Sequence, residues 1–384
     1  MFIDRNYIML RYRQLLEEKQ KELQKSSIIA DKRGKLKYRF PQWLRKIVFH
    51  PYNPAYSMFL QLKAQDSSRY KTTLPLDALH PYATDFLDYI ISHDLKFDSS
   101  LYFHDKNDDF IRYFLDCRIK SLIPGYNQIT MNKQQQDVFV LREKLKKSTQ
   151  KTVDGYTLTS GGEKYFLPKS AFSEHSYIHD YGLKHLPESV KKYIAGKVFL
   201  DLGAYVGDTA LMLSKRYNPK QIYAFEPVGI NIALLKKTIA KNSANNIILV
   251  QKGIGSEKAS LDILINENNL ASCTINKSLN NTYSKKETVE ITTIDSECTP
   301  EITVGLIKMD IEGLEYAAIT GGLETIKRDR PVLLVSIYHT AKDFFEIPEL
   351  LKQAVPSYTF SLFDLDHLSP LVDKILVAYP SELQ

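Results

Sequence analysis

The fold can be predicted from the segment Lys197-Val-Phe-Leu-Asp-Leu-Gly-Ala-Tyr-Val-Gly-Asp-Thr209. Residues 198–200 form a short apolar run, which is typical of a strand buried on both faces of a parallel sheet. The glycine-spaced residues 201–207 then indicate a tight turn. Two good capping residues follow, and the apolar pattern of 210–216 predicts a helix. A strand, a glycine turn and a helix in this order place backbone N–H groups at the crevice where open α/β sheets bind ligands.

The spacing of this turn excludes two common phosphate sites. A dinucleotide fingerprint G-x-G-x-x-G that starts at Gly203 needs glycines where Tyr205 and Asp208 stand. A G-x-x-x-x-G-K phosphate loop needs Gly and Lys at Asp208 and Thr209. The carboxylates of Asp201 and Asp208 flank the turn, and they would repel a pyrophosphate but suit a ligand with ammonium and sulfonium charges. The predicted ligand is therefore S-adenosylmethionine.

A second apolar strand, at 221–225, ends in Glu226 and Pro227. It follows the first strand by about twenty residues, where a carboxylate can accept hydrogen bonds from two ribose hydroxyls. The turn at 251–255 is expected at the same edge of the sheet, close to an adenine ring. In an alternative interpretation, Asp201 is only a helix cap and Glu226 a surface charge. The expected cofactor-binding residues are Asp201, Gly203, Ala204, Tyr205, Gly207, Asp208, Thr209, Glu226, Pro227, Lys252, Gly253, Ile254 and Asp310.

Strands alternate with helices beyond residue 197, which predicts a parallel sheet. The last two strands are separated by too few residues for a parallel crossover, so we expect them to pair antiparallel. The resulting α/β sheet, mostly parallel with an antiparallel last strand, is similar to the Rossmann-like sheet of class I methyltransferases. Further core strands are expected at 247–250, 304–310, 331–337, 358–363 and 374–379, helices at 230–242 and 314–326, and an antiparallel insertion at 261–265 and 289–293 around a polar loop at 266–286.

Residues 1–150 are predicted to form a mostly helical accessory region, and residues 151–384 the methyltransferase-like domain. Apolar periodicity indicates helices at 8–23, 85–91 and 109–115. The first of these is amphipathic and could pack on the body of the protein or on a second subunit, so a homo-oligomer is a further expectation. A hairpin is expected at 154–168. Together with the residues that lead into the first core strand, we expect it to cover the cofactor.

Composition sets outer limits on these predictions. The 384 residues, 43% of them hydrophobic, are enough for two domains with a real core. Three cysteines without C-x-x-C spacing argue against a disulfide framework or structural zinc, so a cytoplasmic location is expected. No signal peptide and no run of eighteen apolar residues is visible, so we expect no membrane span. No metal site is expected, because the early histidines lack ligand-like spacing: His50, His80, His93 and His104.

The net charge of +6 is unevenly spread, because residues 5–46 are dense in Lys and Arg while the rest of the chain is near neutral. The basic segment 32–46 within this stretch also holds Tyr38, Phe40 and Trp43. Such a segment could bind an anionic membrane surface, an acidic glycan or a nucleic acid. The alternative is a solvated, partly mobile face.

Several blocks of sequence resemble the FkbM family of S-adenosylmethionine-dependent methyltransferases, over roughly residues 154–380. The most specific block is Lys308-Met-Asp-Ile-Glu-Gly-Leu-Glu315 with the upstream Thr-x-Asp. The resemblance implies O-methylation, often of sugars on polysaccharide, lipopolysaccharide, glycolipid or secondary-metabolite scaffolds. The expected partner is thus a sugar or small-molecule acceptor. The other blocks are the turn at 201–208, Phe225-Glu-Pro227, Thr292-Thr-Ile-Asp295, and Tyr338-His339 with Glu346-Ile-Pro348.

One block departs from the family. Members that share the Tyr-His block often carry a basic Arg-His patch on the sixth strand, where this chain has Phe-Asp-Leu-Asp at 363–366.

Methyl transfer to a sugar hydroxyl needs an aimed oxygen and a base. Asp310 and Glu312 follow the fourth strand, and His339 follows the fifth, so all three are expected at one edge of the sheet. We expect His339 to act as the base, because its ordinary pKa suits proton transfer near neutrality. Asp310 would orient the cofactor or the acceptor. Glu312 would bind acceptor hydroxyls or act as the base in place of His339.

Structural alternatives exist for the same residues. Glu315 could be a helix-dipole partner, and His339 a strand-end histidine bonded to a backbone carbonyl. The carboxylates of Asp310, Glu312 and Asp295 could instead hold a magnesium ion.

Two other functions compete with a glycan O-methyltransferase. The basic N-terminal part would suit a nucleic-acid methyltransferase. That function is disfavoured, because the fourth strand ends in Met-Asp-Ile-Glu and lacks the Asn/Asp-Pro-Pro-Tyr/Phe block of aminomethylases. A third function is a non-catalytic scaffold that binds S-adenosylmethionine and acts through its N-terminal helices.

Overall fold

The computed structural model describes residues 2–32, 73–75, 81–101, 108–123, 128–130, 133–265, 285–366 and 372–384. The basic segment beyond Lys32, three of the early histidines, Cys273 and the polar loop at 266–284 lie outside these residues. Within the described parts, no helix is both long enough and apolar enough to cross a bilayer.

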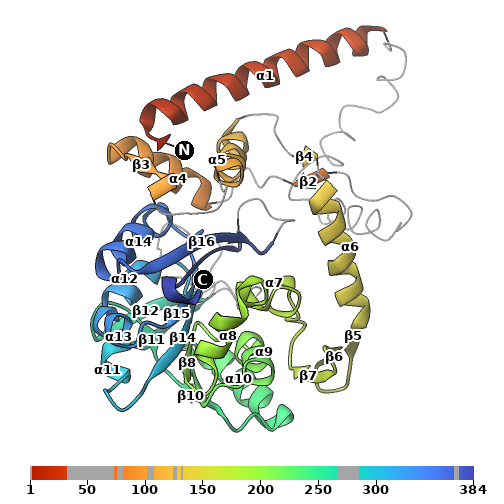
Figure 1. Cartoon of the computed structure of the whole chain (residues 1–384). Coiled ribbons are helices and arrows are strands. Elements are labelled where there is room, and N and C mark those ends of the chain that lie inside the picture. The colour runs from red at the N-terminus through yellow and green to blue at the C-terminus, as the bar shows by residue number, and fades with distance from the viewer. Residues whose placement is uncertain are drawn as a thin grey trace.

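A seven-stranded sheet forms the centre of the molecule (Figure 1). The first five strands in its spatial order run parallel, and the sixth pairs antiparallel with both of its neighbours. This arrangement confirms the predicted α/β class I sheet. In spatial order, the strands are β10 (Ile247–Val250), β9 (Gln221–Phe225), β8 (Val198–Leu202), β14 (Val304–Met309), β15 (Val332–Ser336), β17 (Lys374–Pro380) and β16 (Tyr358–Asp364).

Successive side chains of β8 enter two different cores. Phe199 packs with the core that contains α8 (Glu188–Ile194) and α9 (Asp208–Arg216). Leu200 packs with the opposite core, which contains α13 (Leu323–Asp329) and α14 (Ala341–Ala354). Because strand side chains alternate between faces, an apolar run with no polar interruption is required where both faces are covered.

The predicted helix at 314–326 is wrong in one respect, since it consists of α12 (Glu315–Thr320) and α13, which are separate helices. The chain breaks at Gly321 and Gly322. A Cβ atom on Gly321 would lie 2.3 Å from the carbonyl oxygen of Gly255, so this close approach requires glycine. The other helix predicted here, α10 (Gly229–Asn242), begins and ends near its expected bounds.

Two small sheets flank the central one. In the first, β12 (Ala259–Ile265) and β13 (Lys285–Thr292) pair antiparallel and β11 (Gly253–Ile254) pairs parallel to β13, which confirms the predicted insertion. The second contains β5 (Thr149–Lys151), β6 (Tyr156–Ser160) and β7 (Glu163–Leu167), and it confirms the predicted hairpin.

The hairpin does not cover the ligand pocket described below. The amide nitrogen of Phe166 in β7 donates to Asn242 of α10 at 2.9 Å, and the Asn242 side chain donates back to the Phe166 carbonyl at 2.8 Å. The expected lid is therefore wrong for this hairpin, which is held against the outside of α10. Behind it follow α7 (Glu174–Tyr177) and the 3-10 segment η2 (Asp180–His185).

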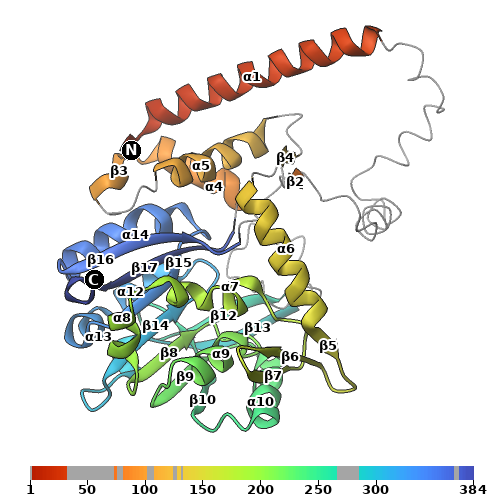
Figure 2. The ribbon, with the colours of Figure 1, turned by 45° about the vertical axis from the view of Figure 1, so that its right-hand side comes forward.

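The first 150 residues contain the predicted helices. These are α1 (Arg5–Lys32), α4 (Pro81–Ser92) and α5 (Asp108–Leu122). A further helix, α6 (Lys133–Ser148), was not predicted. Figures 1 and 2 show α4 and α5 between α1 and the face of the sheet that α14 covers. Short strands connect these parts: β1 (Phe2–Ile3) with β3 (Phe97–Asp98), and β2 (Thr73–Pro75) with β4 (Gln128–Thr130).

An aromatic cluster joins the accessory helices to α14. The ring centroids of Phe114 and Phe344 lie 5.0 Å apart in a stacked arrangement, and those of Phe86 and Phe344 lie 5.6 Å apart. Phe97 meets Phe345 edge to face at 5.2 Å. Such contacts stabilise beyond simple burial. The accessory helices thus share one core with the sheet, and a domain boundary at residue 150 stays a prediction.

Candidate active site

The turn after β8 is pressed against the end of β14. Gly203 has φ +78°, and a Cβ atom there would lie 1.9 Å from the carbonyl oxygen of Asp310. Only glycine permits this approach. Tyr205, two residues later, also has a left-handed backbone conformation, with φ 48°. Its amide donates to the carboxylate of Glu226 at 2.9 Å, which joins the turn to the end of β9.

Glu226 is the buried carboxylate at the edge of the pocket. Besides the backbone N–H of Tyr205, it accepts the backbone N–H of Val228 at 3.0 Å and the side-chain amide of Asn231 at 3.3 Å. Burial raises the pKa of Glu226 to about 7, although these hydrogen bonds favour its ionised form. A carboxylate in this position fits the role of accepting ribose hydroxyls.

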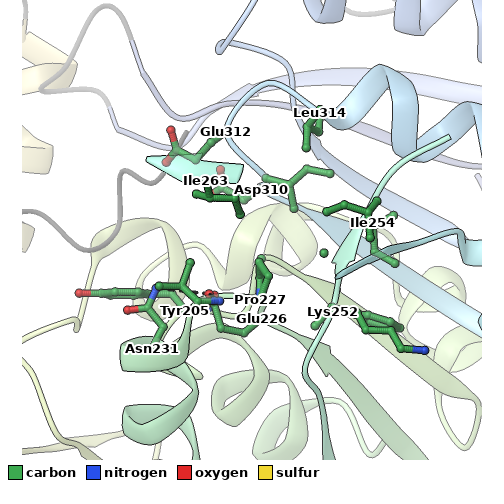
Figure 3. A pocket seen from close by; sticks show the side chains of 16 residues that line it. Tyr205, Glu226, Pro227, Asn231, Lys252, Ile254, Ile263, Asp310, Glu312 and Leu314 are labelled. Carbon is green, nitrogen blue, oxygen red and sulfur yellow. Dashed lines mark hydrogen bonds between the residues drawn. The ribbon is translucent and has the colours of Figure 1, made fainter. Parts of the chain in front are cut away.

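A pocket with about 720 Å³ of empty space, open solvent included, lies at the carboxyl ends of β8, β9 and β14. Figure 3 shows Asp310, Glu312 and Leu314 on one side of it and Tyr205, Glu226 and Asn231 on the other. Eight of the expected cofactor residues line it: Gly203, Tyr205, Glu226, Pro227, Lys252, Gly253, Ile254 and Asp310.

Seven lining residues were not expected from the sequence, and three of them bear on ligand binding. Ile263 of β12 and Ile291 of β13 join Ile254 in an apolar wall that suits an adenine ring. Their strands were predicted, but apolar residues on an insertion are indistinguishable from ordinary core residues. Asn231 is a polar residue in the first turn of α10, five positions after Glu226, and that proximity was the available signal.

Five expected cofactor residues do not line the pocket: Asp201, Ala204, Gly207, Asp208 and Thr209. Asp201 is fully buried and pairs with the Lys308 ammonium at 3.0 Å. Lys308 also donates to the carbonyl oxygen of Gly203 at 2.8 Å. The charge of Asp201 is therefore offset within the protein. This differs from the expectation that it faces a positive ligand directly.

The carboxylate of Asp208 likewise interacts with a buried group of the protein. This carboxylate accepts the hydroxyl of Ser176 in α7 at 3.0 Å, and the side chain is almost wholly buried. The residue before it, Gly207, caps α9 with φ +83° where a Cβ atom would meet Leu235. These residues shape the turn, whereas Asp310, Glu312 and Glu226 place acidic groups around the pocket itself.

His339 and three acidic residues meet where β14 and β15 end. Its Nδ1 lies 2.9 Å from the carboxylate of Glu315. Its Nε2 faces Asp310 at 3.5 Å and Glu312 at 3.8 Å. The structure thus brings together all three residues expected to be catalytic. Glu312 has φ 58°, a left-handed conformation that costs energy and often marks functional sites.

Glu315 holds this turn together. One carboxylate oxygen accepts the backbone N–H of Ile311 at 2.8 Å, and the other accepts that of Gly313 at 2.9 Å. Both oxygens are thus committed to the turn, and one of them also contacts His339. The arrangement fixes the imidazole so that Nε2 is directed at Asp310 and Glu312.

The pKa of His339 departs from the ordinary value that the sequence suggested. Burial lowers the pKa, but Glu315, Glu312 and Asp310 outweigh this effect and raise it to about 10. The imidazole is therefore charged at neutral pH in the protein without ligand, and a role as base requires that it lose this proton.

The magnesium alternative receives limited support. Asp310, Glu315 and His339 each offer a ligand atom within 4.8 Å of one another. The oxygens of Glu315 already accept backbone N–H groups, however, which favours a hydrogen-bonded network. Asp295 accepts the backbone N–H groups of Glu324 and Thr325, at 3.2 and 2.8 Å, and so caps α13.

Tyr181 of η2 is a site residue that sequence reasoning missed. Its hydroxyl donates to Asp310 at 2.8 Å and lies 3.0 Å from the hydroxyl of Ser336. It is buried, with φ 55°. No local pattern singles out one tyrosine among 24, because its role depends on a contact across 129 residues.

Residues 201–362 match the model of the Methyltransferase FkbM domain. None of the curated proteins compared matches the chain in sequence. The match covers less than half of the chain, and it includes both the turn after β8 and the cluster around His339.

Solved structures of methyltransferases are similar to the chain at low identity. Methyltransferase FkbM from Methylobacillus flagellatus KT is 16% identical, with 85% of this chain and 72% of that chain covered and a TM-score of 0.44. An rRNA methylase from Streptococcus thermophilus is 13% identical, with 50% and 92% covered and a TM-score of 0.30. TYW2 from M. jannaschii, in complex with AdoMet, is 15% identical, with 60% and 97% covered and a TM-score of 0.34. At these TM-scores the likeness carries no argument about function.

Glu226 generates a testable prediction about ligand binding. Its ionised carboxylate is the form that accepts two ribose hydroxyls, and its pKa is about 7. S-adenosylhomocysteine should therefore bind about tenfold more tightly at pH 8 than at pH 6, measured by titration calorimetry. Glu226→Gln should bind more weakly at both pH values and lose this dependence. An unchanged pH dependence in Glu226→Gln would contradict the assignment.

The residues present fit the cofactor that the family uses. Gly203 leaves room beside β14, the Glu226 carboxylate lies at the end of β9, and Ile254, Ile263 and Ile291 form an apolar wall. Glu226, Asp310 and Glu312 supply the acidic surroundings that a cationic ligand requires. Residues 201–362 therefore form a domain that matches the FkbM methyltransferases, and the cofactor of this enzyme is S-adenosylmethionine.

Proposed function

We propose that this enzyme methylates a hydroxyl group of a sugar or glycan and that His339 removes the hydroxyl proton. The observation that carries the proposal is the position of His339. Its Nε2 faces Asp310 and Glu312, which both line the cofactor pocket, while its Nδ1 is fixed by Glu315. His339 is buried and does not itself line the pocket, so the acceptor oxygen would have to reach Nε2 at the edge marked by Asp310 and Glu312.

We assign each side chain of the site a separate role in methyl transfer. When bound, S-adenosylmethionine supplies the methyl group. Asp310 lines the pocket, accepts the Tyr181 hydroxyl at 2.8 Å with one carboxylate oxygen and faces Nε2 of His339 with the other. Glu312, on the rim, accepts hydrogen bonds from acceptor hydroxyls. His339 takes the proton from the reacting oxygen as the new C–O bond forms, and Asp310 and Glu312 then stabilise the imidazolium.

The charges around His339 make it a stronger base than an ordinary histidine. Glu315, Glu312 and Asp310 raise its pKa to about 10 against the effect of burial. Its neutral form is consequently scarce at neutral pH. That form nevertheless has a higher proton affinity, which suits a weakly acidic sugar hydroxyl.

The acidity of the site disfavours the nucleic-acid alternative. Glu226, Asp310 and Glu312 line the opening, and they would repel the phosphates of an RNA or DNA acceptor. A neutral sugar has no such penalty, because its hydroxyl groups donate to carboxylates. The basic segment that could contact phosphates lies outside the described residues.

The acceptor class can be tested by following S-adenosylhomocysteine release from the purified enzyme. Neutral oligosaccharides should support turnover and RNA should not. His339→Gln should lower kcat by about 10²- to 10⁴-fold and leave the affinity for S-adenosylhomocysteine unchanged. His93→Gln, which changes an exposed histidine in the turn after α4, serves as the matched control. Turnover on RNA alone would contradict the proposal, and cofactor binding without turnover on any acceptor would favour a scaffold role.

The pH dependence of kcat tests the identity of the base. Only neutral His339 can accept a proton, and its raised pKa places the titration on the alkaline side. With a supporting acceptor, kcat should rise about tenfold per pH unit from pH 6 to pH 8, and His339→Gln should be slow and flat over this range. A flat profile in the unaltered enzyme would exclude His339 as the base and favour Glu312.

A further inference from the structure

An arginine of the accessory region contacts the segment that carries His339. Arg118 in α5 is fully buried, and its Nη2 donates to the backbone carbonyl oxygen of Tyr338 at 3.1 Å. The two residues are 220 positions apart in sequence. The carbonyl that Arg118 holds belongs to the peptide group that leads directly into His339.

The surroundings of Arg118 are aromatic. Its guanidinium carbon lies 3.8 Å from the ring centroid of Phe86 and 4.4 Å from that of Phe114. Phe114 in turn stacks on Phe344 of α14. Removing a guanidinium from water is costly, and cation–π contacts offset only part of that cost. A leucine or methionine would fill the same space without this desolvation cost, so the position points to a role beyond packing.

The segment between β15 and α14 is held from several directions. The amide of Ile337 donates to the carbonyl of Lys374 at 3.0 Å, and Thr340 caps α14 by accepting the amide of Asp343 at 3.1 Å. Between these anchors stand Tyr338 and His339, both buried. Because the peptide group is planar, a hydrogen bond to the Tyr338 carbonyl also fixes the direction in which the His339 backbone begins.

We propose that Arg118 is a positioning residue through which the accessory helices hold His339 in the orientation needed for proton removal. The inference rests on the function proposed above and assigns α4 and α5 a part in it. Arg118 is not among the residues that line the pocket, and the contact through which it would act on the chemistry is its hydrogen bond to the Tyr338 carbonyl.

The test compares Arg118→Met with Arg118→Lys and a control, Arg11→Met. Arg11 of α1 also binds α5, through Asp116 at 3.0 and 2.5 Å, but it does not contact the 338–339 peptide. Arg118→Met should lower kcat at least tenfold and leave S-adenosylhomocysteine affinity within about twofold. Arg118→Lys, which keeps a cationic donor, should recover part of the loss. Arg11→Met should keep kcat near that of the unaltered enzyme.

A double-mutant cycle separates positioning from general destabilisation. If Arg118 acts through His339, then Arg118→Met should cause little further loss in the His339→Gln background. Equal losses in both backgrounds, or an equal loss in Arg11→Met, would overturn the inference. If Arg118→Met does not fold, the same cycle is run with Arg118→Lys, and the same additivity would overturn it.

Hydrogen exchange provides a readout that needs no acceptor. In Arg118→Met, the amides at 337–340 should exchange faster than in the unaltered protein, while those at 203–207 should not. In the Arg11→Met control, neither set should exchange faster. Unchanged exchange at 337–340 in folded Arg118→Met would overturn the inference. Failure of the unaltered enzyme to methylate any sugar would instead count against the proposed function, and the exchange result would remain interpretable.

Discussion

The carboxylate of Glu315 connects the ends of two neighbouring strands, and the active-site geometry depends on it. It accepts the N–H groups of Ile311 and Gly313 after β14 and contacts Nδ1 of His339 after β15. Without these three contacts, the left-handed turn at Glu312 would lose its support and His339 its orientation. One buried carboxylate thus stabilises the turn after β14 and also orients the histidine after β15.

The buried ion pair of Lys308 and Asp201 leaves the charge around a ligand to the residues of the pocket wall. Lys308 neutralises Asp201 and holds the carbonyl of Gly203, so that the turn after β8 stays against β14. The acidic character of the pocket then comes from residues at its wall: Glu226, Asp310 and Glu312. A cationic cofactor and a hydroxyl acceptor both suit this distribution, whereas a phosphate does not.

Local sequence patterns were sufficient for the sheet and for many of the residues that line the pocket. The strand–turn–helix at 197–216 and the carboxylate at Glu226 follow from periodicity and spacing, and the sheet has the predicted strand directions. What could not be predicted depends on long-range contacts. The pairing of Lys308 with Asp201, the hydrogen bond from Tyr181 to Asp310 and the carboxylates that charge His339 are of this kind. The break at Gly321 likewise depends on a neighbour, Gly255, that local propensity does not reveal.

The ionisation of His339 tests the central claim most directly. An NMR titration of its imidazole nitrogens, in protein labelled at histidine, should show a pKa near 10 in the protein without ligand, because Glu315, Glu312 and Asp310 outweigh burial. The same titration in Glu315→Gln should show a lower pKa. A value at or below the ordinary 6.5 in the unaltered protein would contradict the account of how these carboxylates hold the histidine.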